Sequence, residues 1–127
     1  MFETTVGEGR HRISLTLIDT GRGWIGSLVG GESPHVGGVV LAWPLDSQDA
    51  DAPGCELREL HLPGHLDHQA ALPMARQLCQ RLHTAISITA GIHVEQADAE
   101  DIRVLLHNCS RARDEFFVRL EEPSAGS

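Results

Sequence analysis

The sequence predicts a single α+β domain with a mainly antiparallel sheet and two helices. The chain has 127 residues, which is the length of one ordinary domain. Hydrophobic residues make up 41% of it and charged residues 22%, both close to the averages of globular proteins. Apolar residues alternate in the first half of the chain and recur at helical spacing in two later segments, so the element order is strand, strand, strand, strand, helix, strand, helix.

Four strands are expected before the first helix. Residues 12–17 alternate apolar and polar side chains, and a glycine-containing turn separates them from the short apolar segment 24–29, which predicts a hairpin. The segment 36–43 is almost continuously apolar, as is typical of a central strand covered on both faces. Residues 56–62 restore the alternation and predict an edge strand.

Two amphipathic helices and a short buried strand are expected in the second half. Apolar residues recur at helical spacing over residues 67–82, and residues 84–90 are typical of a buried strand. Asp98 can cap the second helix, because its carboxylate can accept from the first free N–H groups. We therefore predict one domain over residues 1–120, with residues 121–127 as a disordered tail.

Composition excludes several classes of function. The formal net charge is −8 and the basic residues are scattered, so we expect no nucleic-acid partner. The longest apolar stretch, residues 39–44, is far too short to cross a bilayer, so we expect no membrane partner. Cys55, Cys79 and Cys109 lack metal-type spacing, which favours a reducing, cytoplasmic location and buried thiols. The sequence contains no nucleophile elbow, phosphate-binding P-loop, dinucleotide fingerprint or CxxC pair, so we expect no enzyme activity.

Two glycine-containing segments are candidates for a binding site. A polar loop that includes His35 leads into a strand that starts with Gly37 and Gly38. Glycines inside a strand indicate that a ligand or another backbone segment comes close. Gly91 is expected to end the buried strand, and His93 follows it in a loop, where functional residues often lie.

A histidine cluster between the fourth strand and the first helix allows two interpretations. His61, His65 and His68 lie within eight residues, which is compatible with a small metal-dependent enzyme. The segment overlaps the end of the zinc signature of metallo-β-lactamase-like hydrolases, but Pro63 stands where the first histidine of that signature belongs. The other interpretation is a solvated polar loop in which Asp67 caps the helix.

Four phrases, taken in order, resemble one known family. They are GESPHVGGVVLA at 31–42, GHLD at 64–67, AGIH at 90–93 and NC at 108–109. In order and spacing they resemble the small prenylated-flavin chaperone family, typified by an accessory protein of gallate decarboxylase. The resemblance spans roughly residues 9–120.

The resemblance implies a fold, a ligand and partners. The expected fold is similar to that of bacterial relatives of the proteasome-assembly chaperones, and the expected assembly is a homodimer. Members of the family bind reduced prenylated flavin mononucleotide (FMN) and help to load it into UbiD-like decarboxylases without catalysing the decarboxylation. A structural assembly chaperone that acts by protein contacts alone is the other alternative.

Residue by residue, the resemblance also implies a binding site. The implied ligand-binding residues are His35, Gly37, Gly38, His65, Asp67, Gly91, Ile92, His93 and Asn108. Imidazoles and glycine-rich backbone suit a flavin phosphate, so His35 and His93 are the expected phosphate ligands. Val39, Leu41 and Ile92 are expected to form the apolar floor under the flavin ring.

Overall fold

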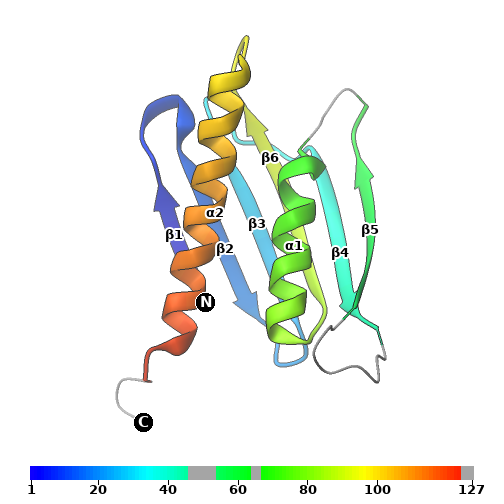
Figure 1. Cartoon of the computed structure of the whole chain (residues 1–127). Coiled ribbons are helices and arrows are strands. Elements are labelled where there is room, and N and C mark those ends of the chain that lie inside the picture. Colours follow the sequence, from blue (N-terminus) through cyan, green and yellow to red (C-terminus); the bar gives the residue numbers. More distant parts are fainter. Residues whose placement is uncertain (46–53, 64–66, 124–127) are drawn as a thin grey trace.

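The computed structural model describes residues 1–45, 54–63 and 67–123, and these form a sheet with two helices packed on one face (Figure 1). The strands are β1 Phe2–Val6, β2 Ile13–Asp19, β3 Trp24–Gly31, β4 Gly38–Pro44, β5 Cys55–His61 and β6 Ile86–His93. The helices are α1 His68–Leu82 and α2 Ala99–Glu121, and a short 3-10 helix, η1, spans Gly9–His11. The predicted fold class and element order are confirmed, apart from β1 and η1, which the sequence analysis missed.

The six strands lie in the order β1-β2-β3-β6-β4-β5. Strands β3 and β6 pair in parallel, with Gly31 opposite His93, whereas the other described neighbours pair antiparallel. Because β6 lies between β3 and β4, the chain that joins β3 to β4 must cross the end of β6. This crossing positions the site described below.

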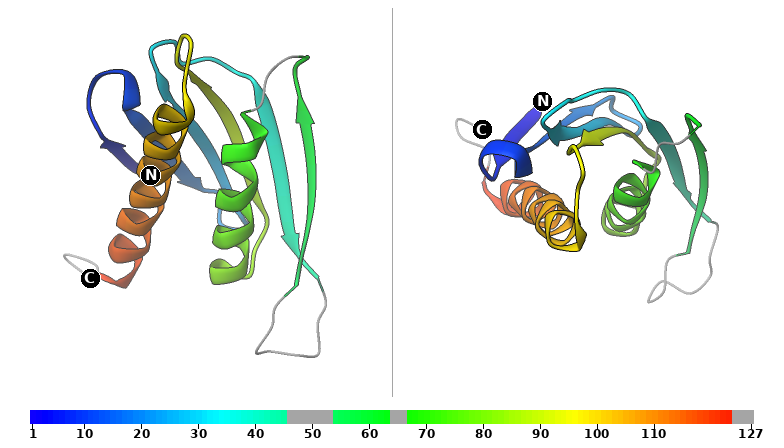
Figure 2. Two further views of the ribbon diagram at one scale, coloured as in Figure 1. Left: turned by 45° about the horizontal axis from the view of Figure 1, so that its top comes forward. Right: turned by 90° about the horizontal axis from the view of Figure 1, so that it is seen from above.

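Side-chain alternation places the core between the sheet and the helices. Leu15, Leu28 and Ile88 from the sheet are fully buried, and Leu78 of α1 and Phe116 of α2 pack onto them. Both helices cover the same face, which leaves the other face of the sheet open (Figure 2). One face of the sheet therefore packs against the helices, and the described residues leave the other face uncovered.

Two strand predictions need correction. Strand β4 is covered on one face only, because Val39 is half-buried and Leu41 is 46% exposed on the face without helices. Strand β6 does not end at Gly91 but continues to His93, because Gly91 and His93 pair with β3. The sequence predicted that Gly91 ends the strand, whereas in the structure Gly91 allows another segment of the chain to approach β6.

The ends of the helices largely agree with the sequence. Asp98 caps α2 as predicted, in a capping box in which Asp98 accepts from the backbone of Asp101 and Asp101 accepts from that of Asp98. Helix α2 runs to Glu121, the first residue of the predicted tail 121–127, and residues 124–127 of that tail lie outside the described residues. None of the described helices is long and apolar enough to cross a membrane.

Candidate functional site

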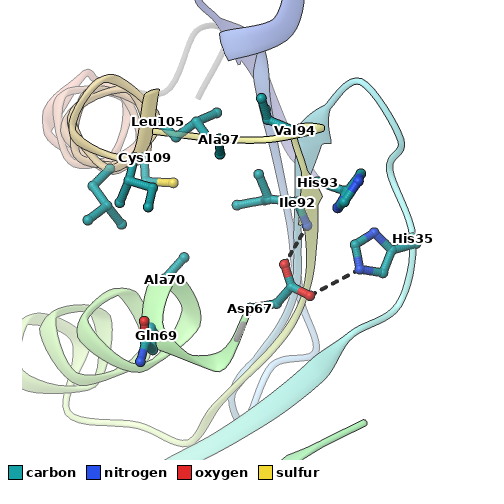
Figure 3. Close-up of a pocket in the computed structure, with 12 residues that line it drawn as sticks. His35, Asp67, Gln69, Ala70, Ile92, His93, Val94, Ala97, Leu105 and Cys109 are labelled. Atoms are coloured by element: carbon teal, nitrogen blue, oxygen red, sulfur yellow. Dashed lines mark hydrogen bonds and ion pairs between the residues drawn. The ribbon is translucent and has the colours of Figure 1, made fainter. Parts of the chain in front are cut away.

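A cavity of about 330 Å³ lies between the first turns of α1 and α2 and the end of β6 (Figure 3). Its rim is polar, with His35, Asp67 and His93 on one side and Gln69 on α1. Its walls are mostly apolar, from Ile92, Val94, Ala97, Ile102, Leu105 and Leu106. We call this the site cavity.

The crossing loop, residues 32–37, builds the polar side of the site cavity. It is held against the end of β6 by backbone hydrogen bonds. The N–H of Glu32 donates to the carbonyl of His93 at 2.7 Å, and that of Gly37 donates to the carbonyl of Ala90 at 2.8 Å. The loop therefore continues the pairing of β6 after β3 has ended, and it carries His35 to the cavity.

Two of the predicted glycines are required by close packing inside the protein. A Cβ atom on Gly91 would lie 1.5 Å from the carbonyl oxygen of His35. A Cβ atom on Gly37 would lie 1.8 Å from Oδ2 of Asp67. The close neighbour of Gly37 is thus the Asp67 side chain, and that of Gly91 is the backbone of the crossing loop.

Asp67 joins the three segments that meet at the polar side of the cavity. Its side chain is 6% exposed. Its Oδ1 accepts the N–H of Ile92 at 2.7 Å, and its Oδ2 lies 3.0 Å from Nε2 of His35 (Figure 3). Asp67 is the N-cap residue of α1, at the place where the sequence predicted a cap, but its carboxylate points toward His35 and β6 and makes no side-chain cap hydrogen bond.

Both ring nitrogens of His35 have a partner in this geometry. Its Nδ1 lies 2.9 Å from the carbonyl oxygen of Ser33, and its Nε2 lies 3.0 Å from the Asp67 carboxylate. The Asp67 carboxylate is the more buried member of the pair, at 6% exposed against 25% for His35.

His93 forms a second, more exposed pair. It is the last residue of β6, and its Nε2 lies 3.2 Å from Oε2 of Glu95. The side chain of His93 is 50% exposed and that of Glu95 is 78% exposed. The ring centroids of His35 and His93 are 6.5 Å apart, so both imidazoles can contact one ligand.

The structure does not bring all the predicted residues together. Asn108 is buried away from the cavity, where its Nδ2 donates to the carbonyl of His11 at 2.9 Å and joins α2 to η1. Gly38 lines a separate hollow of about 350 Å³ on the open face of the sheet. Val39 and Leu41 face the same way, so they cannot form one floor with Ile92, which points toward the helices. His65 lies outside the described residues.

The predicted metal cluster lies partly outside the described residues. Within the described part of the chain, no group of three His, Cys, Asp or Glu side chains could hold a metal ion. His65 and the side chain of His68 fall outside that part, so the metal-enzyme alternative stays a prediction.

Several lining residues were missed because their helix faces resemble ordinary core. Leu105 and Cys109 lie on the apolar, buried face of α2, and both line the cavity. Burial raises the pKa of the Cys109 thiol to about 12, so the thiol stays protonated and is a poor nucleophile. Helical periodicity identified this face but not the gap between α2 and α1.

Comparisons with known proteins agree with the fold. A chain from the structure described as the crystal structure of a novel chaperone complex for yeast 20S proteasome assembly is similar, with a TM-score of 0.62 and 13% sequence identity. The match covers 94% of this chain and 95% of that chain, and at this identity it shows the fold alone. No curated protein matches the chain significantly.

The family comparison covers nearly the whole domain. The model of the prenylated flavin chaperone LpdD-like domain matches residues 7–121. The matched range includes the crossing loop, both helices and each residue that lines the site cavity. The chain therefore belongs to the LpdD-like prenylated flavin chaperone family.

Proposed function

We propose that this protein is a non-catalytic carrier that binds reduced prenylated FMN in the site cavity and delivers it to a UbiD-like decarboxylase. The observation that carries the proposal is the cavity itself. The cavity has apolar walls and one polar side, on which the Asp67 carboxylate forms hydrogen bonds with His35 and with the backbone N–H of Ile92. Family membership supports a flavin ligand and a chaperone role.

The cavity fits the ring portion of such a ligand. Its volume of about 330 Å³ lies at the lower end of the range of roughly 300–1,000 Å³ for small-molecule sites, so it suits the rings better than a whole flavin nucleotide. The apolar side chains Ile92, Val94 and Leu105 would contact the ring faces. The pyrimidine edge of a flavin carries N–H and C=O groups, which Gln69 and His93 on the rim can meet.

The side chains around the cavity support binding rather than catalysis. Cys109 stays protonated because burial raises its pKa to about 12. His35 is engaged by Ser33 and Asp67 through both ring nitrogens, so it is poorly placed to exchange a proton with a ligand. A carrier needs shape, apolar contact and a few polar contacts, and the cavity offers these.

The proposal includes a homodimer formed through the open face of the sheet. Ile25, Leu41 and Leu60 are 53%, 46% and 75% exposed, and they project from β3, β4 and β5 on the side without helices. A water-facing sheet surface usually carries polar residues, and clustered exposed apolar residues are typical of an interface. Leu41→Glu should shift the particle mass in multi-angle light scattering from that of a dimer to that of a monomer.

Anaerobic titration tests ligand binding directly. Purified protein is titrated with reduced prenylated FMN, and with plain reduced FMN as a control for the prenyl group. Ile92→Ala and His93→Ala should weaken binding of the prenylated form by about tenfold, since each removes roughly 1–2 kcal/mol of contact. His107→Ala is the matched control, because His107 is exposed on α2 and does not line the site cavity.

The same experiment separates the alternatives. Absence of binding to either flavin, with the decarboxylase still captured, would favour an assembly chaperone that acts by protein contacts. Stoichiometric metal that survives desalting would favour the metal-enzyme interpretation. Transfer is tested by mixing the loaded protein with cofactor-free decarboxylase, and the carrier proposal requires that decarboxylation activity appears.

A further inference from the structure

The site cavity continues into a second cavity between the two helices. This second cavity has a volume of about 170 Å³. Four residues line both cavities, namely Gln69 and Ala70 of α1 and Leu106 and Cys109 of α2. The two cavities are therefore adjacent, and we call the pair the groove; its lining follows α2 from Ile102 to Arg113, or roughly 16 Å at the helical rise of about 1.5 Å per residue.

The end of the groove near β6 is poorly suited to a phosphate. His35 lies beside the Asp67 carboxylate, which is 6% exposed and little screened by water, whereas the Glu95 carboxylate beside His93 is 78% exposed and balances that imidazole only weakly. The first turn of α2 is also occupied by acidic groups, because Asp98 and Asp101 form the capping box. A phosphate dianion beside His35 would face the Asp67 carboxylate, which lines the cavity and is mostly buried, and this is unfavourable.

The opposite end of the groove carries a guanidinium. Arg113 lines the second cavity, and its side chain is 20% exposed. Its Nη1 donates to the side-chain carbonyl of Gln77 on α1, and its Nη2 and Nε both donate to Oδ1 of Asp114, at 2.8 Å and 3.1 Å, so a phosphate at Arg113 must compete with Asp114. Asp114 is 63% exposed, so water screens this carboxylate and it balances the guanidinium only weakly.

Arg113 is the single Arg or Lys among the described residues that line the two cavities. A guanidinium binds phosphate through two parallel N–H donors, and partial burial strengthens the pairing. The contact with Gln77 holds the guanidinium at the wall of the groove. The two ends of the groove therefore differ: the site cavity is mostly apolar, with the Asp67 carboxylate at its polar side, and the opposite end carries the Arg113 guanidinium.

We propose that Arg113 binds the phosphate of the ligand whose ring system occupies the site cavity. The inference rests on the proposed function and adds to it the orientation of the ligand. The ring portion lies among Ile92, Val94 and Leu105, the ribityl chain follows the groove between the helices, and the phosphate reaches Arg113. This assignment replaces His35 and His93 as phosphate ligands, and those histidines contact the ring portion instead.

The test compares two ligands that differ only in the phosphate. Reduced prenylated FMN is titrated anaerobically, and so is the same flavin after its phosphate has been removed by alkaline phosphatase. Arg113→Gln should weaken binding of the phosphorylated form by about 10- to 100-fold, the usual range for a charge-assisted hydrogen-bonded pair, and leave the dephosphorylated form unchanged. Arg111→Gln is the matched control, since Arg111 is exposed, carries the same charge and lines neither cavity.

Two further variants separate phosphate binding from a purely structural role. Asp114→Asn removes the competing carboxylate and should strengthen binding of the phosphorylated form alone. Arg113→Lys keeps the charge but not the paired donors, and should bind with intermediate affinity. Thermal unfolding of each variant measures what the loss of the contact between Arg113 and Gln77 costs the fold.

The outcomes distinguish this inference from the proposed function. If the wild-type protein binds neither form, both proposals fail. If it binds both forms but Arg113→Gln changes neither, or weakens both equally, the orientation is wrong and the carrier proposal stands. If Arg113→Gln does not fold, Asp114→Asn provides the test. An unchanged ratio of its affinities for the phosphorylated and dephosphorylated flavins would overturn the inference.

Discussion

Replacing Asp67 with alanine is the sharpest test of the polar side of the cavity. The Asp67 side chain is 6% exposed and holds the N–H of Ile92 at 2.7 Å and Nε2 of His35 at 3.0 Å. Asp67→Ala leaves a partly buried N–H without its acceptor, which costs roughly 1–3 kcal/mol. It also removes the carboxylate that pairs with His35, whose side chain is 25% exposed, so this part of the cost stays below the 3–5 kcal/mol typical of breaking a fully buried pair. We expect a total loss of about 2–4 kcal/mol.

The assay is urea unfolding followed by circular dichroism. A domain of this size has a denaturant dependence of roughly 1–3 kcal/mol per molar urea, so the midpoint should fall by about 1–2 M. Glu95→Ala is the matched control at the same end of the molecule. The side chains of His93 and Glu95 are 50% and 78% exposed, and such exposed pairs contribute less than about 1 kcal/mol to the free energy of unfolding.

A double-mutant cycle checks the cause. If the loss comes from the pairing, His35→Ala should cost much less in the Asp67→Ala background than in the wild-type protein. The reasoning is refuted if Asp67→Ala and Glu95→Ala have the same unfolding midpoint. Such a result would mean that burial does not distinguish the two histidine–carboxylate pairs.

Three more predictions concern other parts of the structure. Gly91→Ala places a Cβ atom 1.5 Å from the carbonyl oxygen of His35, so it should displace the crossing loop and destabilise the fold by about 2–4 kcal/mol in urea unfolding. Gly54→Ala, whose Cβ atom would lie 3.4 Å from its nearest neighbour, Cδ1 of Leu45, should cost less than half as much. Burial raises the pKa of the Cys109 thiol to about 12, so this thiol should react with iodoacetamide at pH 8 only after unfolding. The unfolded thiol ionises at lower pH, so the contribution of Cys109 to stability is complete below about pH 8.5 and should be lost as the pH rises toward 12. The Sγ atoms of Cys55 and Cys79 lie 3.0 Å apart, so the oxidant diamide should form a disulfide between them within one chain, taking up two protons and two electrons from the thiols. Peptide mass mapping would show this disulfide, and Cys55→Ser should abolish it.

Much of the fold could be predicted because it depends on local patterns. Strands β2 and β3 and both helices have strong periodicity, and Asp98 is followed by the acidic residues of a capping box. Strand β1 was missed because Phe2–Val6 has apolar residues only at its two ends, so it shows little alternation. Its partner β2 supplies the register, and that information is not local.

The insertion of β6 between β3 and β4 could not be deduced from the sequence. Periodicity identifies strands but not their neighbours, so the parallel pairing of β3 with β6 was not foreseen. The error at Gly91 has the same origin, because the crossing loop that requires this glycine is adjacent only in space. Resemblance brought His35, Asp67 and His93 together correctly, but it also included Asn108, whose neighbour Cys109 is the residue that lines the cavity.

The polar side of the cavity has a property that a carrier would need. The Asp67 carboxylate accepts the N–H of Ile92 and lies 3.0 Å from Nε2 of His35, so none of these three groups needs a ligand atom as a partner. An incoming flavin would therefore gain affinity mainly from apolar contact in the cavity and from the phosphate at Arg113, and not by filling an unsatisfied polar pocket. Apolar contact and a single partly exposed ion pair give moderate affinity, and a carrier must bind its ligand less tightly than the enzyme that receives it. If the transfer experiment shows movement of the flavin, tightening the site with Asp114→Asn should slow that transfer, because the same change that strengthens binding of the phosphate raises the cost of release.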